Sequence, residues 1–166
     1  INCGESITSY PTGNSPSTTE AWFRASSGNA EIVDWGTEGG GNKVQIRLVS
    51  PPKIYIDGNG ASFNGNSTLA FGQWYHVAHT YTSGSGKIYI NGQLDGSGGV
   101  TMNFANPAKM WIGGWYNSYS FVGDIDEVRV SKVTRSADWI KLDYQNQSSV
   151  QTLVGPLVQP GSTFSM

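Results

Sequence analysis

Acidic residues alternate along one segment of the chain, GDIDEV at 123–128. Alternate residues of a β-strand share a face, so Asp124 and Asp126 are expected to lie side by side. Retaining glycosidases use two carboxyl groups about 5–5.5 Å apart. The next residue on that face is Val128, whereas Glu127 is expected to point to the opposite face. The segment therefore lacks a complete catalytic set, and we predict that the chain is not an enzyme.

Other residues with reactive side chains also form no catalytic set. His76 and His79 are three positions apart in an expected strand, so they should face opposite sides and cannot ligate one metal ion. Cys3 is the only cysteine and has no histidine near it in the sequence. The glycine-rich segments at 38–43 and 96–100 lack the Lys-Ser/Thr pair of a phosphate-binding loop, so we interpret them as turns.

Aromatic residues gather in the segment WIGGWYNSYSFVGD at 111–124. Sugars stack their apolar C–H faces on exposed aromatic rings, and a few polar groups nearby hold their hydroxyls. The predicted ligand-binding residues here are Trp115, Tyr116, Asn117 and Tyr119. The alternative is that the tryptophans pack inward and that the tyrosines cover a sheet edge.

A second candidate binding segment is IVDWGTEGGGNK at 32–43. Trp35 follows Asp34 and precedes a glycine-rich turn, so the pair is a candidate for the same rim of the molecule. Ligand binding and packing are both open for these two residues.

The elements that must position these residues are almost all β-strands. Short β-branched and aromatic runs recur about every ten residues between turn residues, which is typical of an antiparallel sandwich or barrel. Asn91-Gly92 predicts a type I′ hairpin turn, because both central residues must accept positive φ. One short helix is expected near 137–144, with Ser136 as N-cap and Trp139, Leu142 and Ile140 as its buried stripe. The expected strands are 18–24, 30–35, 43–49, 53–57, 67–71, 73–82, 86–91, 108–113 and 122–131.

Length and composition set the class of protein. A chain of 166 residues is expected to form one domain. The net charge of −2 argues against a nucleic-acid binder, and no apolar run approaches the roughly 18 residues of a membrane span. Only 13% of residues are charged and 22 are glycine, which suggests an extracellular protein. Because the first residue is Ile, we expect a processed chain or a fragment.

Several segments together resemble the laminin-G-like, concanavalin-A-like lectin domains of large secreted bacterial proteins. They occur in the order and with the spacing of that family. The resemblance implies an all-β fold, a two-sheet antiparallel β-sandwich of the jelly-roll type, over residues 1–149. Residues 150–166 are expected to form an extended strand or a linker. The matching segments are TTEAWF (18–23), GQWYHVAHTY (72–81), KIYINGQLDGS (87–97), MWIGGW (110–115) and GDIDEVRVSKVTRSADWI (123–140).

The resemblance also carries implications for metal binding and assembly. It implies that Asp126 or Asp124 helps to hold a structural Ca²⁺. The resemblance also implies that a strand preceding INCGES in the family is missing here, so an incomplete calcium site is expected. The missing strand leaves an edge open to homodimerisation, unless residues 150–158 fill the gap. Trp22, Trp74 and Trp139 stand at family-typical positions and are expected to be structural.

The function predicted from these observations is non-catalytic carbohydrate binding by a module of a larger secreted bacterial protein. The ligand is expected to be a glycan, bound through the aromatic loop at the rim of the sandwich. The alternative is a protein–protein adhesion or spacer domain, because one fold carries many functions. A degraded β-glucanase is a remote third possibility, since glucanases of this fold carry three alternating carboxylates on one strand.

Overall fold

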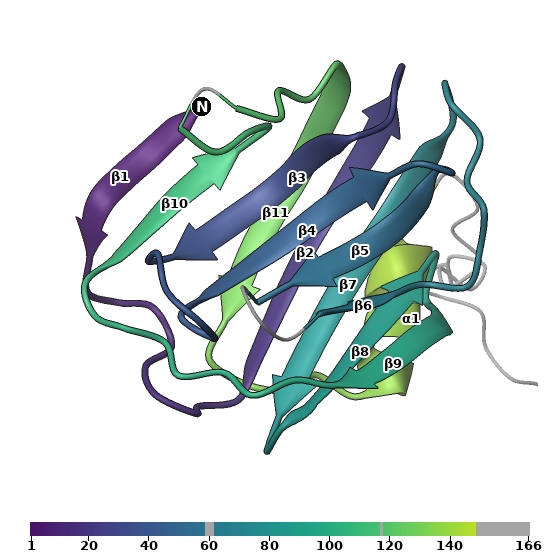
Figure 1. The fold of residues 1–166 in the computed structure, drawn as a ribbon. Helices are drawn as coiled ribbons and strands as arrows, with labels where there is room; N and C mark the ends of the chain where they lie inside the picture. The colour runs from purple at the N-terminus through teal and green to yellow at the C-terminus, as the bar shows by residue number, and fades with distance from the viewer. Residues whose placement is uncertain (59–61, 117, 149–166) are drawn as a thin grey trace, which may run out of the picture.

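The computed structural model describes residues 1–58, 62–116 and 118–148, which form two antiparallel sheets packed face to face (Figure 1). The predicted all-β sandwich is confirmed. The six-stranded sheet has the spatial order β1 (Asn2–Ile7), β10 (Ala108–Ile112), β3 (Ala30–Gly36), β4 (Lys43–Val49), β5 (Lys53–Asp57) and β6 (Ser62–Asn64). The five-stranded sheet has the order β11 (Gly123–Ser131), β2 (Ser17–Ala25), β7 (Trp74–Thr82), β8 (Ser85–Ile90) and β9 (Gln93–Gly99).

The hydrophobic core lies between the two sheets and follows the alternation of their strands. Along β2, Ala21 and Phe23 point inward and are buried, whereas Trp22 between them points outward and is only partly buried. The facing strand β4 contributes Val44, Ile46 and Leu48 in the same way. The inward sides of these strands are therefore mainly apolar, and the two outward faces carry the polar and aromatic residues that concern function.

The hairpin prediction is confirmed, because Asn91 and Gly92 both have positive φ, at 50° and 75°, between β8 and β9. The predicted strand at 67–71 is wrong. Leu69 donates its N–H to the carbonyl of Pro52 outside any ladder, and the short strand β6 forms earlier in the chain.

The helix α1 (Ala137–Gln147) is confirmed with its N-cap, because the Ser136 side chain accepts from the N–H of Trp139. Its buried residue is Ile140, which packs on Ala78 and Tyr89. The predicted burial of Leu142 is wrong, since this side chain is 46% exposed. The side of the helix that faces the five-stranded sheet carries Ile140, Asp143, Tyr144 and Gln147, because these residues contact strands of that sheet.

Four strands lie at sheet edges. Strand β1 pairs only with β10, and β11 pairs only with β2 among the described residues. The predicted extended segment 150–166 lies outside the described residues, and homodimerisation through an edge stays a prediction. No helix in the described part of the chain has the length and apolar character needed to cross a membrane.

Candidate functional site

The aromatic loop after β10 folds back over the outer face of the six-stranded sheet. Gly113 donates its N–H to the carbonyl of Ile32 at 3.0 Å, and the N–H of Glu31 bonds to the carbonyl of Tyr119 at 3.0 Å. These two bonds fix both ends of the loop to β3. We call the surface formed by Trp111, Trp115, Tyr116, Tyr119, Lys109 and Arg47 the loop face.

Trp115 is the anchor of the loop rather than its exposed tip. Its side chain is only 7% exposed, and its indole N–H donates to Oε1 of Glu38. The Lys43 ammonium lies 5.0 Å from its ring centroid. The predicted ligand-binding residue Trp115 is thus placed where it supports the loop, and little of its ring is free for a ligand.

Tyr116 and Tyr119 are the exposed aromatic residues of the loop face, at 40% and 54%. Both have left-handed backbones, with φ of 45° and 52°, a conformation that a non-glycine residue adopts at a cost. The Arg47 guanidinium lies 4.5 Å from the Tyr119 ring centroid. Tyr116 packs against Trp111 at 5.2 Å between ring centroids. Asn117, predicted as their polar partner, lies outside the described residues.

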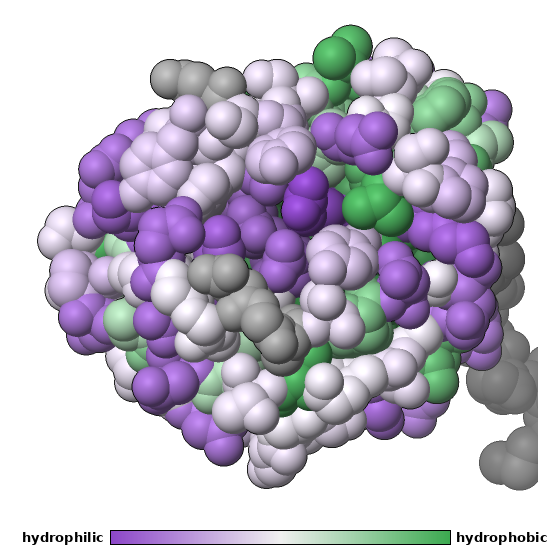
Figure 2. Space-filling view, in the orientation of Figure 1, coloured by the Kyte–Doolittle hydropathy of each residue, from purple (hydrophilic) through white to green (hydrophobic). Residues whose placement is uncertain are grey.

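Beneath the loop, the outer face of β3 and β4 holds a sealed polar cluster. Asp34, Glu31 and Gln45 are buried, and the Gln45 amide donates to Glu31 at 3.1 Å and to Asp34 at 3.4 Å. Burial first, and then the hydrogen bond and charge of Glu31, raise the pKa of Asp34 well above its usual value. Figure 2 shows hydrophilic residues gathered across the middle of this face.

The two residues of the second predicted segment are both inside the molecule. Trp35 is fully buried between the sheets, where its ring contacts Phe104 at 4.5 Å and its N–H donates to Thr19. The prediction that it reaches the rim is therefore wrong, because an inward position of β3 places it in the core. Asp34 points outward but lies under the loop, so it does not reach a ligand directly.

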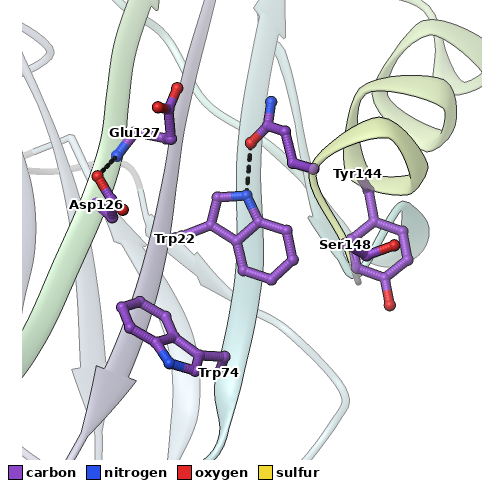
Figure 3. Close-up of a pocket in the computed structure, with 7 residues that line it drawn as sticks. Trp22, Trp74, Asp126, Glu127, Tyr144 and Ser148 are labelled. Atoms are coloured by element: carbon purple, nitrogen blue, oxygen red, sulfur yellow. Dashed lines mark hydrogen bonds between the residues drawn. The ribbon is translucent and has the colours of Figure 1, made fainter. Parts of the chain in front are cut away.

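On the opposite side of the molecule, a groove of about 680 Å³ lies between β11, β2, β7 and α1. We call it the helix-side groove. Figure 3 shows the indole of Trp22 between the carboxylates of β11 and the ring of Tyr144, with Trp74 beside it. Its lining residues are Trp22, Trp74, Asp126, Glu127, Tyr144, Gln147 and Ser148.

A bulge in β11 brings two carboxylates to this groove. Asp126 pairs with Trp22 and Arg129 with Glu20, so two residues of β11, Glu127 and Val128, lie opposite one residue of β2, Ala21. Glu127, with φ of 50°, is the extra residue and is exposed beside Asp126. The prediction that Glu127 points to the opposite face is wrong, because the bulge interrupts the alternation. Val128 then faces the core.

The groove rests on a buried charged cluster under α1. Asp143 is held by Arg129 through two bonds of 2.8 and 3.3 Å, and Nε2 of His76 lies 3.9 Å from it and 3.7 Å from Glu20. Burial raises the pKa of Glu20 to about 7, with a further rise from Asp143 that Arg129 opposes. Burial lowers the pKa of His76 to about 4. His79 lies in the core, so the two histidines face opposite sides as predicted.

The predicted calcium ligands do not form a complete oxygen site in the described part of the chain. Asp124 forms an ion pair with Arg24 at 2.8 Å, and Asp126 accepts the N–H of Glu127. Calcium takes six to eight oxygen ligands, and two carboxylates, one of them bound by a guanidinium, do not supply them. The group of three potential ligands that the described residues do form is Glu20, His76 and Asp143, where Arg129 already neutralises Asp143.

Sequence reasoning missed Trp22 and Trp74 as surface residues. Trp74 is 42% exposed, and both were expected to be structural. The alternation in TEAWFR could have predicted the position of Trp22. Because Ala21 and Phe23 face inward, Trp22 between them must face outward. The bulge at Glu127 has no comparable signal, because GDIDEV contains no glycine or proline after Gly123.

Comparisons with known proteins agree on the fold. A protein from Bacteroides ovatus, described as a candidate carbohydrate-binding protein, is 26% identical at a TM-score of 0.65, over 81% of this chain and 43% of that one. Domain 4 of an extracellular GH43 arabinanase from Geobacillus stearothermophilus, solved with arabinotriose, is 22% identical at a TM-score of 0.62, over 80% and 67%. A heptameric SAP-like pentraxin from Limulus polyphemus is 14% identical at a TM-score of 0.66, over 85% and 76%.

The three structures support different conclusions, because they differ in sequence identity and in coverage. The two under 25% identity show the fold alone, and this chain spans less than half of the Bacteroides protein. No curated protein matches the sequence. The family model of the concanavalin A-like lectin/glucanases superfamily matches residues 5–141. This chain therefore belongs to the concanavalin A-like lectin/glucanase superfamily, as the resemblance predicted.

Proposed function

We propose that this chain is a non-catalytic carbohydrate-binding module of a larger secreted bacterial protein, and that a glycan binds at the loop face against Tyr116 and Tyr119. The observation that carries the proposal is the backbone of these residues. Two tyrosines within four positions hold left-handed conformations and keep their rings exposed. Such strain is kept where the surroundings over-determine it, and it clusters at binding sites.

The rings are held ready for a ligand. Trp111 and Trp115 pack against Tyr116, and Arg47 lies against Tyr119, so neither ring is a freely rotating surface side chain. A rigid aromatic platform loses little conformational entropy when a sugar stacks on it. The Bacteroides relative is also described as a candidate carbohydrate-binding protein.

We propose that the module is non-catalytic because its acidic residues are not arranged as in a glycosidase. Asp34 and Glu31 are buried under the loop, and Asp124 is paired with Arg24. Asp126 and Glu127 are neighbours on one side of the groove, whereas glycosidases place their two carboxyl groups on both sides of the scissile bond. We expect no release of reducing ends from any glycan that binds, and the same absence of release in Asp124→Asn and Asp126→Asn.

The proposal is tested by isothermal titration of the purified chain with glycans selected on an array, each with Ca²⁺ and again with EDTA. Tyr119→Ala and Tyr116→Ala are expected to weaken binding at least about tenfold. Phe71→Ala is the matched control, because this ring is also exposed, at 46%, and lies outside the loop face. Equal binding by all three variants contradicts the loop-face site, and the EDTA arm tests the predicted calcium ion.

The alternative is a protein adhesion or spacer domain. The loop face carries Lys109 and Arg47 beside exposed rings, and aromatic residues and arginine are also enriched in protein interfaces. This alternative predicts no glycan binding and a protein ligand whose capture depends on the same tyrosines.

A further inference from the structure

The helix-side groove has the components of a second binding site, on the opposite face of the sandwich from the loop face. Its floor is the outward face of β2, where Trp22 stands between Asp126 on β11 and His76 on β7 in the strand register. Its volume of about 680 Å³ lies within the range of about 300–1,000 Å³ that small-ligand sites occupy. The groove is thus large enough for a short oligosaccharide.

The aromatic walls are fixed by contacts with α1. The Trp22 indole N–H donates to the Gln147 side chain at 2.6 Å, and the Trp22 ring stacks on Tyr144 at 5.7 Å between centroids. Gln147 in turn donates to Asp143 at 2.8 Å, which Arg129 holds from below. The floor is therefore ordered before any ligand arrives. Trp74 at the open end is 42% exposed, and the Arg24 guanidinium lies 5.4 Å from its ring centroid.

The charge of the groove sets it apart from the rest of this sheet face. Within the described part of the chain, Asp126 and Glu127 form no ion pair, whereas neighbouring Asp124 is bound to Arg24 and Asp143 to Arg129. The bulge that exposes Glu127 costs backbone strain, since a glutamate there adopts φ of 50°. These two carboxylates have no basic partner in the described part of the chain, and they accept hydrogen bonds from hydroxyl or ammonium groups and repel acidic ones.

We propose that the helix-side groove is a second saccharide site, specific for glycans without acidic groups. Neutral sugars stack on Trp22 and Trp74 and donate hydroxyl protons to Asp126 and Glu127, and amino sugars add a charge-assisted bond. Uronic acid and sulfated glycans are rejected by the two carboxylates. The inference rests on the proposed function in that the ligand is a glycan, but it uses a different face, so the module has two contact points for one polysaccharide.

The test uses the indole N–H signals of ¹⁵N-labelled protein, whose six tryptophans include Trp22 and Trp74 in the groove and Trp111 and Trp115 at the loop face. The probes are cellotriose, xylotriose, arabinotriose, N-acetylchitotriose, the glucosamine trimer and the galacturonic acid trimer. The variants are Trp74→Ala and the pair Asp126→Asn with Glu127→Gln, with Tyr119→Ala as the control on the other face. Circular dichroism confirms that each variant is folded.

At least one non-acidic trimer is expected to shift the Trp22 and Trp74 signals, with affinity falling about tenfold or more in Trp74→Ala and unchanged in Tyr119→Ala at this site. The galacturonic acid trimer is expected to bind only after the carboxylates are neutralised. The inference is overturned if Trp22 and Trp74 signals stay still while glycan binding depends on Tyr119, a result that leaves the proposed function intact. It is also overturned if the acidic trimer shifts them equally. If no tryptophan N–H signal shifts with any of the probes, the proposed function is contradicted as well.

Discussion

The two outward faces of this sandwich use the same residue types in opposite ways. On the six-stranded sheet, Asp34 and Glu31 are buried, the loop is bound to the backbone of Glu31, and Trp115 is buried with its indole N–H bonded to Glu38. On the five-stranded sheet, Trp22 and Trp74 line a groove beside Asp126 and Glu127, whose carboxylates have no basic partner among the described residues. Acids near aromatic rings therefore do not by themselves mark a site, because exposure and pairing decide whether a ligand can reach them.

Backbone strain marks the same two faces. The described non-glycine residues with positive φ are Asn29, Ser83, Asn91, Tyr116, Tyr119 and Glu127. Asn and Ser are ordinary residues at such turn positions. The other three are a glutamate and two tyrosines, and they lie at the helix-side groove and the loop face.

The largest loss of stability is expected from replacing Trp115, which anchors the loop on the six-stranded sheet. Trp115→Ala removes a 7% exposed ring together with its bond to Glu38 and its contact with Lys43. We expect a loss of about 3–5 kcal/mol in the free energy of unfolding, measured by urea denaturation. Tyr116→Ala is the matched control and should cost less than about 1 kcal/mol, because this ring is 40% exposed. Equal losses would mean that Trp115 does not seal the loop.

The charged support of the open face should respond to pH through two groups of opposite sign. Glu20 has a pKa raised to about 7 from 4.5, so it stays protonated in the folded chain and costs stability as pH rises through that window. His76 has a pKa lowered to about 4 from 6.5, so it costs stability as pH falls through that window.

Uncharged polar variants separate these two effects. Relative to the unmodified chain, Glu20→Gln should gain about 1 kcal/mol of unfolding free energy for each pH unit of rise between about pH 5 and 7. His76→Gln should gain a similar amount for each unit of fall between about pH 6 and 4.5. The check is urea denaturation across this range. Parallel pH profiles for all three proteins would refute the placement of these groups in a water-excluded cluster.

The wall of the groove depends on the helix cap. Ser136→Ala deletes the acceptor for the N–H of Trp139 and should lower the unfolding free energy by about 1 kcal/mol. Ser136→Asp keeps an acceptor and should restore it. Hydrogen exchange at α1 provides the local readout, and unchanged protection in Ser136→Ala would show that packing of Ile140 alone holds the helix.

The exposed rings should matter least for stability. Tyr119→Ala and Trp74→Ala are each expected to change the unfolding free energy by less than about 1 kcal/mol, because both rings are largely exposed. Their effects belong to binding, one at each face. A large loss of stability in either variant would assign that ring to structure.

Much of the fold could be predicted from sequence because its signals are local. The alternation around Phe23, the Asn91-Gly92 turn and the Ser136 cap each follow from neighbouring residues. The candidate sites depend on contacts between distant segments. Whether Trp115 is open or sealed is decided by Glu38, and the side on which Glu127 lies is decided by the pairing of β11 with β2. Neither the burial of Trp115 nor the side on which Glu127 lies can be predicted from the residues next to it in the sequence.

The central claim is that this chain binds glycans through exposed aromatic rings without cleaving them. The most direct measurement is a glycan array probed with the purified chain, in Ca²⁺ and in EDTA, followed by a reducing-end assay on every glycan that binds. We expect binding to a defined set of glycans and no release of reducing ends. An array without binding across plant, algal and animal glycans would contradict it and favour the protein adhesion or spacer domain.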